Sequence, residues 1–174
     1  MMTTLVTFDT RLFHPSTILV SGPTGSGKTT FTKSLLSFRQ NIFQPTPPKF
    51  VILVYDVWQD AYNYFIENNL VDLTVKGLND FEYLKEVFLE KKQFGGCLLL
   101  LDDQQSAIDQ NVVELYTVLS HHLNVTCILL TQSLFVGKKE YRTVSLNSHY
   151  IVLMKNTRDA SSITNLAKQT HPYR

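Results

Sequence analysis

The sequence has few cysteines, almost no excess of charge and no long hydrophobic run. Its two cysteines, Cys97 and Cys127, stand inside apolar segments, which is typical of buried thiols in a reducing compartment rather than of a disulfide framework. The net charge of +1 excludes the strong basic excess of a stand-alone nucleic-acid-binding domain, so any contact with DNA must be local or shared among subunits. The apolar runs are far too short to span a membrane, and the first residues do not read as a signal peptide. We therefore expect an intracellular protein, or one inside a virus particle or an organelle.

Apolar runs of strand length alternate with segments that have a helical pattern. The runs cover residues 17–20, 50–55, 97–101, 126–130 and 150–154. Between them, apolar residues recur at helical spacing, as in Phe31, Leu35 and Phe38, in Tyr62, Phe65 and Ile66, in Phe81, Leu84, Val87 and Phe88, and within residues 112–123. This alternation predicts an α/β fold with a mainly parallel sheet, and the length predicts a single domain over residues 1–174.

The sequence G-P-T-G-S-G-K-T directly follows the first apolar run and is a complete phosphate-binding loop. Gly22, Gly25 and Gly27 supply positions where the backbone can take unusual dihedral angles and present N–H groups to phosphate oxygens. Lys28 is placed to reach the β and γ phosphates of ATP, and the Thr29 hydroxyl to complete the shell of a Mg²⁺ ion. A glycine-rich turn that binds nothing is the structural alternative, but strand, loop and helix all match the context of the motif. We expect the nucleotide to be bound by Gly22, Pro23, Thr24, Gly25, Ser26, Gly27, Lys28, Thr29 and Thr30.

Polar side chains end two further apolar runs. Asp102 and Asp103 follow four leucines at the carboxyl end of the third run, where ligands bind in open α/β sheets. Asp102 is predicted to hold Mg²⁺, directly or through water, and Asp103 to orient and deprotonate the attacking water. The alternative is that the two carboxylates cap a loop, although their mutual repulsion disfavours this without a cation. Gln132 follows the fourth run, and its amide can donate to the γ phosphate and accept from the water at once. The alternative is that it is a solvated polar group, as such a residue taken alone usually is.

Several longer segments carry a family resemblance. They are the phosphate loop preceded by F-H-P-S, the L-L-L-L-D-D ending at Asp103, and the segments S-H-H-L-N-V, T-Q-S-L-F and R-T-V-S-L-N-S-H-Y-I-V-L-M-K-N-T-R-D. With them the chain resembles the genome-packaging ATPases of the FtsK/HerA superfamily, above all those of poxvirus-like large DNA viruses and of Polinton/Maverick and adintovirus elements. The resemblance covers nearly the whole chain. One departure is Asp103, where many related motors have Glu.

The resemblance implies a fold, a chemistry and partners. The fold is the additional-strand, RecA-like form of the three-layer P-loop NTPase, in which the strand leading to Gln132 lies between those leading to Gly22 and Asp102. The activity is hydrolysis of ATP with Mg²⁺ by a homo-oligomeric ring that moves double-stranded DNA into a capsid through its portal vertex. Arg142 and Arg158 flank the fifth apolar run, and either is a candidate arginine finger that acts on a neighbouring subunit. The chain reads as a trimmed version of a longer motor.

Two other functions share the phosphate loop. A nucleoside kinase would carry an arginine-rich lid, and residues 130–150 offer only Lys138, Lys139 and Arg142 for it. A nucleotide-binding interaction module that does not hydrolyse ATP is the second alternative, and the intact acidic pair and phosphate loop disfavour it.

Overall fold

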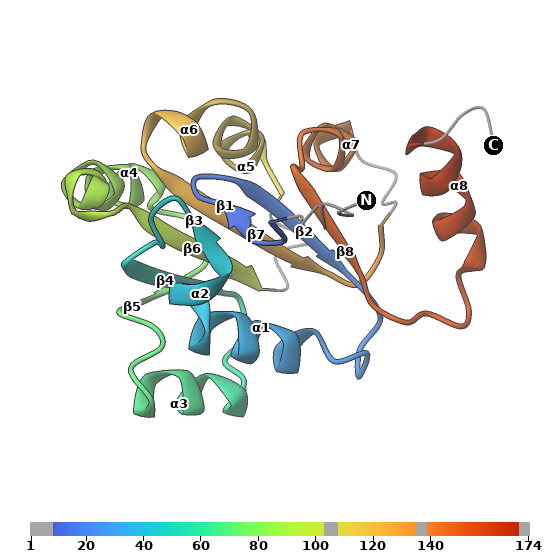
Figure 1. Cartoon of the computed structure of the whole chain (residues 1–174), viewed down its shortest axis with the longest axis horizontal. Coiled ribbons are helices and arrows are strands. Elements are labelled where there is room, and N and C mark those ends of the chain that lie inside the picture. The colour runs from blue at the N-terminus through green and yellow to red at the C-terminus, as the bar shows by residue number, and fades with distance from the viewer. Residues whose placement is uncertain (1–8, 103–107, 135–138, 171–174) are drawn as a thin grey trace, which may run out of the picture.

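The computed structural model describes residues 9–102, 108–134 and 139–170, and its centre is a six-stranded parallel sheet (Figure 1). The strands are β2 (Thr17–Ser21), β4 (Phe50–Tyr55), β5 (Leu73–Lys76), β6 (Cys97–Asp102), β7 (Val125–Thr131) and β8 (Tyr150–Leu153). Their order across the sheet is β5-β4-β6-β7-β2-β8, and every neighbouring pair is parallel. The predicted parallel α/β fold is therefore confirmed. The expected strand order is confirmed as well, because β7 lies between β2 and β6.

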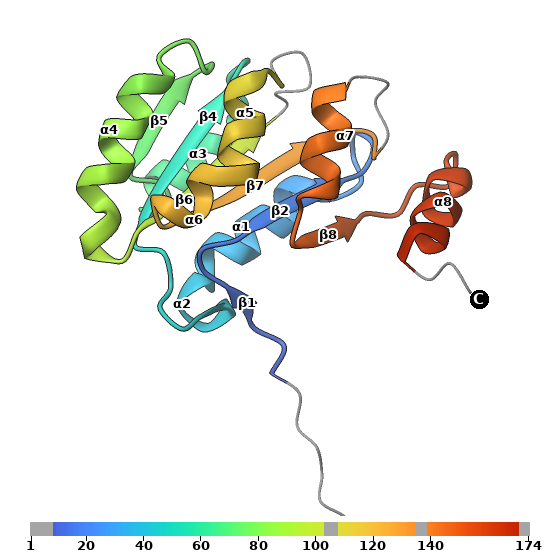
Figure 2. The ribbon, with the colours of Figure 1, turned by 90° about the horizontal axis from the view of Figure 1, so that it is seen from above.

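Helices cover both faces of this sheet (Figures 1 and 2). On one face lie α1 (Lys28–Ser37) and α3 (Asp60–Glu67); on the other lie α4 (Phe81–Lys91), α5 (Gln110–Glu114) and α7 (Lys139–Leu146). The short elements are α2 (Arg39–Ile42), the 3-10 turn η1 (Lys92–Phe94), the π-helical turn η3 (Leu115–Leu119), α6 (Ser120–His122) and the parallel pair β1 (Leu12–Phe13) and β3 (Phe43–Gln44). Helix α8 (Ala160–Thr170) stands beyond the edge strand β8. In the described residues, no helix is long and apolar enough to cross a membrane.

The central strands are apolar throughout because both of their faces are covered. In β6, Cys97, Leu99 and Leu101 join the hydrophobic cluster under α4 and α5, while Leu98 and Leu100 join the cluster under α1 and α3. Alternate side chains of a strand point to opposite faces, so a continuous apolar run is what such a position requires. Both cysteines are buried free thiols.

Two details of the predicted helices are wrong. Phe38 was expected on the buried face of the first helix, but that helix ends at Ser37 and the Phe38 side chain is 61% exposed. The buried face of α1 is formed instead by Thr32, Leu35 and Leu36. Ile66 was expected to be buried beside Tyr62 and Phe65, but it is 44% exposed, because those two aromatic residues alone face the sheet from the short helix α3.

Candidate nucleotide site

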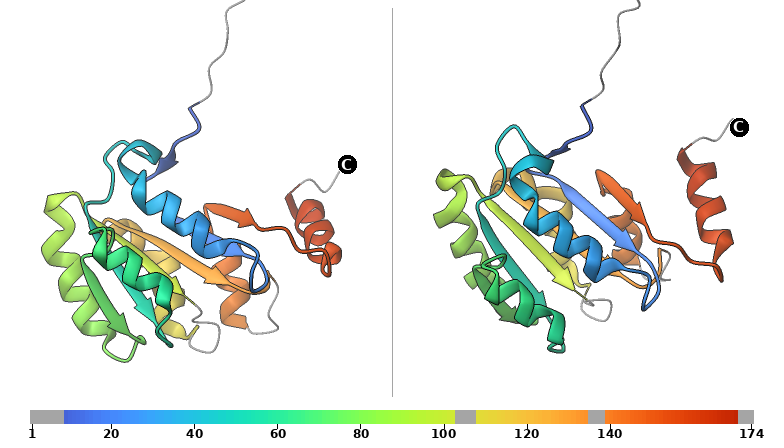
Figure 3. Two further views of the ribbon diagram at one scale, coloured as in Figure 1. Left: turned by 90° about the horizontal axis from the view of Figure 1, so that it is seen from below. Right: turned by 60° about the horizontal axis from the view of Figure 1, so that its bottom comes forward.

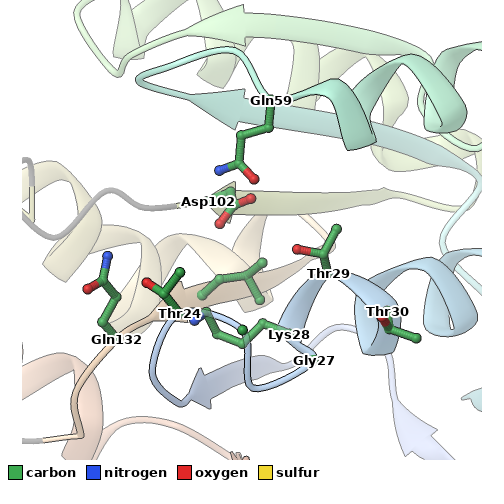
Figure 4. A pocket seen from close by; sticks show the side chains of 10 residues that line it. Thr24, Gly27, Lys28, Thr29, Thr30, Gln59, Asp102 and Gln132 are labelled. Atoms are coloured by element: carbon green, nitrogen blue, oxygen red, sulfur yellow. The ribbon is translucent and has the colours of Figure 1, made fainter.

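The register of three strands brings the predicted site residues to one edge of the sheet. Ser21 of β2 pairs with Thr131 of β7, and Leu130 of β7 pairs with Asp102 of β6. The N–H of Gly22 donates to the carbonyl oxygen of Thr131 over 3.0 Å. The phosphate loop, Gln132 and Asp102 therefore follow three neighbouring strands at the same carboxyl edge (Figure 4).

The glycines of the loop are required for two different reasons. Gly25 and Gly27 have φ angles of 77° and 97°, in the left-handed region, which confirms the unusual dihedral angles predicted for them. Gly22 was expected to need unusual dihedral angles too, but its φ is not positive. It is needed for space, since an added Cβ would lie 2.5 Å from the Cβ of Met154 and 2.6 Å from the Oγ of Ser26.

Helix α1 begins at Lys28, directly after the left-handed Gly27, and its first turn contains no acidic residue. The positive end of its dipole therefore faces the loop without a competing anion from its own sequence. The Lys28 ammonium donates to the carbonyl oxygens of Gly22 and Pro23, at 2.5 and 3.1 Å. The Oγ of Ser26 is buried and has no hydrogen-bond partner in the described structure. A phosphate group fits this cradle, because its oxygens accept hydrogen bonds from the donors that the loop gathers.

A cavity of about 450 Å³ opens at this edge, which is within the usual size range of small-molecule sites. The residues that line it are Thr24, Gly25, Gly27, Lys28, Thr29, Thr30, Gln59, Asp102, Leu130 and Gln132. Most of the predicted nucleotide-binding residues are thus brought together in one cavity. Gly22, Pro23 and Ser26 are not part of its lining, and Gly22 lines a smaller neighbouring cavity that also includes Gln132.

Asp102 is held by a residue that the sequence analysis had placed only in the core. The Tyr62 hydroxyl donates to the Oδ2 of Asp102 over 2.8 Å, and the two side chains are 1% and 7% exposed. The Gln59 amide, from the segment between β4 and α3, is directed toward the same carboxylate (Figure 4). Gln59 could have been found from its position after the carboxyl end of a parallel strand. For Tyr62 the sequence held no signal beyond its apolar spacing.

Gln132 is held in place through its two neighbours. The Tyr141 hydroxyl of α7 donates to the carbonyl oxygen of Ser133 and lies 3.1 Å from the Oγ1 of Thr131. Burial raises the pKa of Tyr141 to about 12, so the hydroxyl keeps its proton at neutral pH and remains a donor. Helix α7 thereby contacts the residues on both sides of Gln132, through the side chain of Thr131 and the backbone of Ser133.

The remaining predicted residues lie elsewhere. Asp103 is outside the described residues, and its role stays a prediction. Arg142 lies on α7 and Arg158 follows β8; both are exposed, and neither lines the cavity of its own chain. Lys139, one of the cations available for a kinase lid, begins α7, whereas Lys138 is outside the described residues.

Comparisons with known proteins extend this description. A family model described as Poxvirus A32 protein matches residues 7–169. No curated protein sequence matches the chain.

Among solved structures, the cytoplasmic domain of EssC is 14% identical, with a TM-score of 0.57, and the match covers 87% of this chain and 33% of that one. A structure of EssC (ATPases 2 and 3) from Geobacillus thermodenitrificans is 14% identical, with a TM-score of 0.56, over 87% and 34% of the two chains. A KaiC-like protein from Pyrococcus horikoshii OT3 is 15% identical, with a TM-score of 0.53, over 83% and 76%. The chain thus spans about one third of the length of the two EssC structures. At these identities the likeness shows the fold, a RecA-like P-loop α/β fold, as predicted.

Proposed function

Since the chain belongs to the poxvirus A32 protein family and is a P-loop ATPase, we propose that it is the motor that packages double-stranded DNA into a capsid. The observation that carries the proposal is the single sheet edge at which the phosphate loop, Asp102 and Gln132 meet, with β7 between β2 and β6. The motor acts in the host cell at the site of virion assembly, and residues 1–174 form its ATPase domain.

The chemistry assigns one role to each side chain. The loop N–H groups and the Lys28 ammonium bind the β and γ phosphates of ATP and compensate their charge. Thr29 and Asp102 hold Mg²⁺, which supplies further positive charge to the phosphate oxygens when it is bound. Asp103 accepts a proton from the attacking water, whose oxygen bonds to the γ phosphorus as the bond to the β–γ bridging oxygen breaks. ADP and phosphate are the products, and Gln132 contacts both the water and the γ phosphate.

The motor works as a homo-oligomeric ring of the FtsK/HerA type around double-stranded DNA, docked on the capsid vertex. Because the net charge is only +1, the DNA contact is local or shared among subunits. Arg142 is our first choice for an arginine finger that acts on the neighbouring subunit, and Arg158 the second. The exposure of both side chains, outside the cavity of their own chain, supports this role.

A nucleoside kinase finds no support in the described residues. Lys139 and Arg142 are the cations of the described part of the segment between β7 and β8, and neither lines the cavity. A kinase lid would place such cations over the transferred phosphate.

The test is ATP hydrolysis by the purified chain with and without double-stranded DNA. We expect stimulation by DNA, and we expect the Lys28→Ala variant to lose about 100-fold or more of this activity, because the phosphate charge is then poorly compensated. Lys33→Ala is the matched control, since Lys33 lies on the same helix over the Tyr64 ring and outside the cavity. Full activity of Lys28→Ala would show that the phosphate loop is not the catalytic site. Phosphorylation of an added nucleoside would favour a kinase.

A further inference from the structure

The two ends of the sheet carry opposite charge. Residues 56–91 form α3, β5 and α4 at one end, and they include eight acidic and three basic side chains, a net charge of −5. Most of these carboxylates are exposed, including Glu67, Glu86 and Glu90. We call this surface the acidic end. More than half of the 15 acidic residues of the chain are therefore gathered on it.

The opposite end, beyond strand β8, is basic. Residues 139–170 form α7, β8 and α8, and they include five basic and two acidic side chains, a net charge of +3. The five cations are all exposed: Lys139, Arg142, Lys155, Arg158 and Lys168. We call this surface the basic end. Figure 3 shows the two ends on opposite sides of the molecule, with α3 and α4 at one and α8 at the other.

Both ends also expose apolar side chains beside an edge strand. At the acidic end Leu89 is 56% exposed and Ile66 44%, and at the basic end Leu146 is 66% exposed and Ile163 43%. Strand β5 pairs only with β4, and β8 only with β2, so each strand leaves one edge without a pairing strand in the described structure. Exposed edges and apolar groups next to charges are features of surfaces that another chain covers.

We propose that the basic end of one copy of this chain binds the acidic end of the next copy, head to tail. Contact between two acidic ends or between two basic ends would bring like charges together, so the charge distribution disfavours a symmetric dimer and favours a heterologous contact. A heterologous contact repeats around a ring when its rotation closes. The inference rests on the proposed ring and names the surfaces that form it. Arg142 and Arg158 belong to the basic end, so the contact carries both candidate fingers to the neighbouring subunit.

Two variants are compared with wild type, one with charges reversed at the acidic end and one with charges reversed at the basic end. Association is measured by sedimentation velocity at low salt. Glu67→Lys with Glu86→Lys and Glu90→Lys changes the acidic end from −5 to +1, and Lys155→Glu with Lys168→Glu changes the basic end from +3 to −1. Wild type should form assemblies larger than dimers, and each variant alone should stay monomeric, with a dissociation constant at least roughly 10-fold higher. A 1:1 mixture should form dimers and nothing larger, because only one intact acidic end and one intact basic end can meet. Lys49→Glu with Lys92→Glu, at the amino edge of the sheet, should assemble like wild type.

Monomeric wild type at low salt, assembly of either variant alone, or no dimer in the mixture would each overturn the inference. A salt series on wild type needs no variant, and dissociation should increase as salt screens the charges. ATP hydrolysis with DNA is measured on the same samples. Hydrolysis stimulated by DNA without head-to-tail assembly would overturn only the interface, and assembly without hydrolysis only the proposed function.

Discussion

Asp102 receives a hydrogen bond from a side chain 40 positions away in the sequence. The donor, Tyr62, lies in an aromatic cluster with Tyr55, Trp58 and Phe65, with ring centroids 5.0 to 6.2 Å apart. The rings hold the hydroxyl in place, and the hydroxyl orients the carboxylate that is proposed to bind Mg²⁺. Residues that orient a metal ligand commonly change metal affinity when they are removed.

Tyr62→Phe is expected to raise the Mg²⁺ concentration that ATP hydrolysis requires, while the aromatic packing is kept. The concentration of Mg²⁺ at half-maximal rate should rise roughly 10-fold, because the Asp102 carboxylate loses a donor that fixes it. The free energy of unfolding should fall by about 1–3 kcal/mol, the usual effect of removing a hydrogen bond to a charged group. A loss of stability with an unchanged Mg²⁺ requirement would show that the hydroxyl is only structural. Tyr64→Phe is the control, since Tyr64 lies on the same helix with its ring under Lys33.

The parts of the site that form a local sequence motif could be predicted, and the parts that depend on contacts between distant residues could not. The phosphate loop is a local motif, so its residues could be identified from the sequence, including the left-handed Gly25 and Gly27. The hydrogen bond from Tyr62 depends on how α3 packs beside β6. This packing cannot be predicted from a local sequence pattern. The role of Gly22 likewise depends on Met154, which is distant in sequence.

The strands buried on both faces were predicted, and so was the edge strand β8, but three other elements at the margins were missed. β4 and β6 are continuous apolar runs because helices cover both of their faces. β5 is a half-buried edge strand of four residues, and its weak pattern was missed. α7 buries only Tyr141 and Val144, and α8 has no buried residue in its described part, so neither shows a strong apolar stripe.

One buried histidine joins the segment before β2 to the amino edge of the sheet. His14 is 6% exposed, its Nε2 lies 3.0 Å from the carbonyl oxygen of Gly95, and its Nδ1 lies 2.7 Å from the Thr126 hydroxyl. Since a carbonyl can only accept, the neutral ring carries its proton on Nε2 and accepts from Thr126 at Nδ1. Burial lowers the pKa of His14 from 6.5 to about 4.

We expect the protein to lose stability in acid through this residue. The unfolded chain binds a proton at His14 below pH 6.5, whereas the folded chain binds it only near pH 4. The free energy of unfolding is therefore highest above pH 6.5 with respect to this residue, and it falls as the pH drops. The loss reaches up to about 3 kcal/mol near pH 4. Urea unfolding at pH 7, 6, 5 and 4.5 should therefore show a steeper decline for wild type than for His14→Gln, although the variant is less stable at pH 7. Parallel declines would mean that other groups carry the acid sensitivity.

On the scale of the whole molecule, the candidate ATP site lies at one edge of the sheet, between the basic end and the acidic end (Figures 1 and 3). The proposed head-to-tail ring would place each site next to the cations of a neighbour. Hydrolysis can then be coupled between subunits around a shared DNA. We propose that this coupling moves the chain along the duplex.

The most direct measurement is displacement of a third strand from double-stranded DNA that carries a short triplex. With ATP, the wild-type protein should release the third strand after a delay that grows with the length of duplex between the DNA end and the triplex. Lys28→Ala should release none, and a non-hydrolysable ATP analogue should give none with wild type. Stimulation of ATP hydrolysis by DNA without any displacement would contradict the account, because the chain would then be a DNA-dependent ATPase that does not translocate.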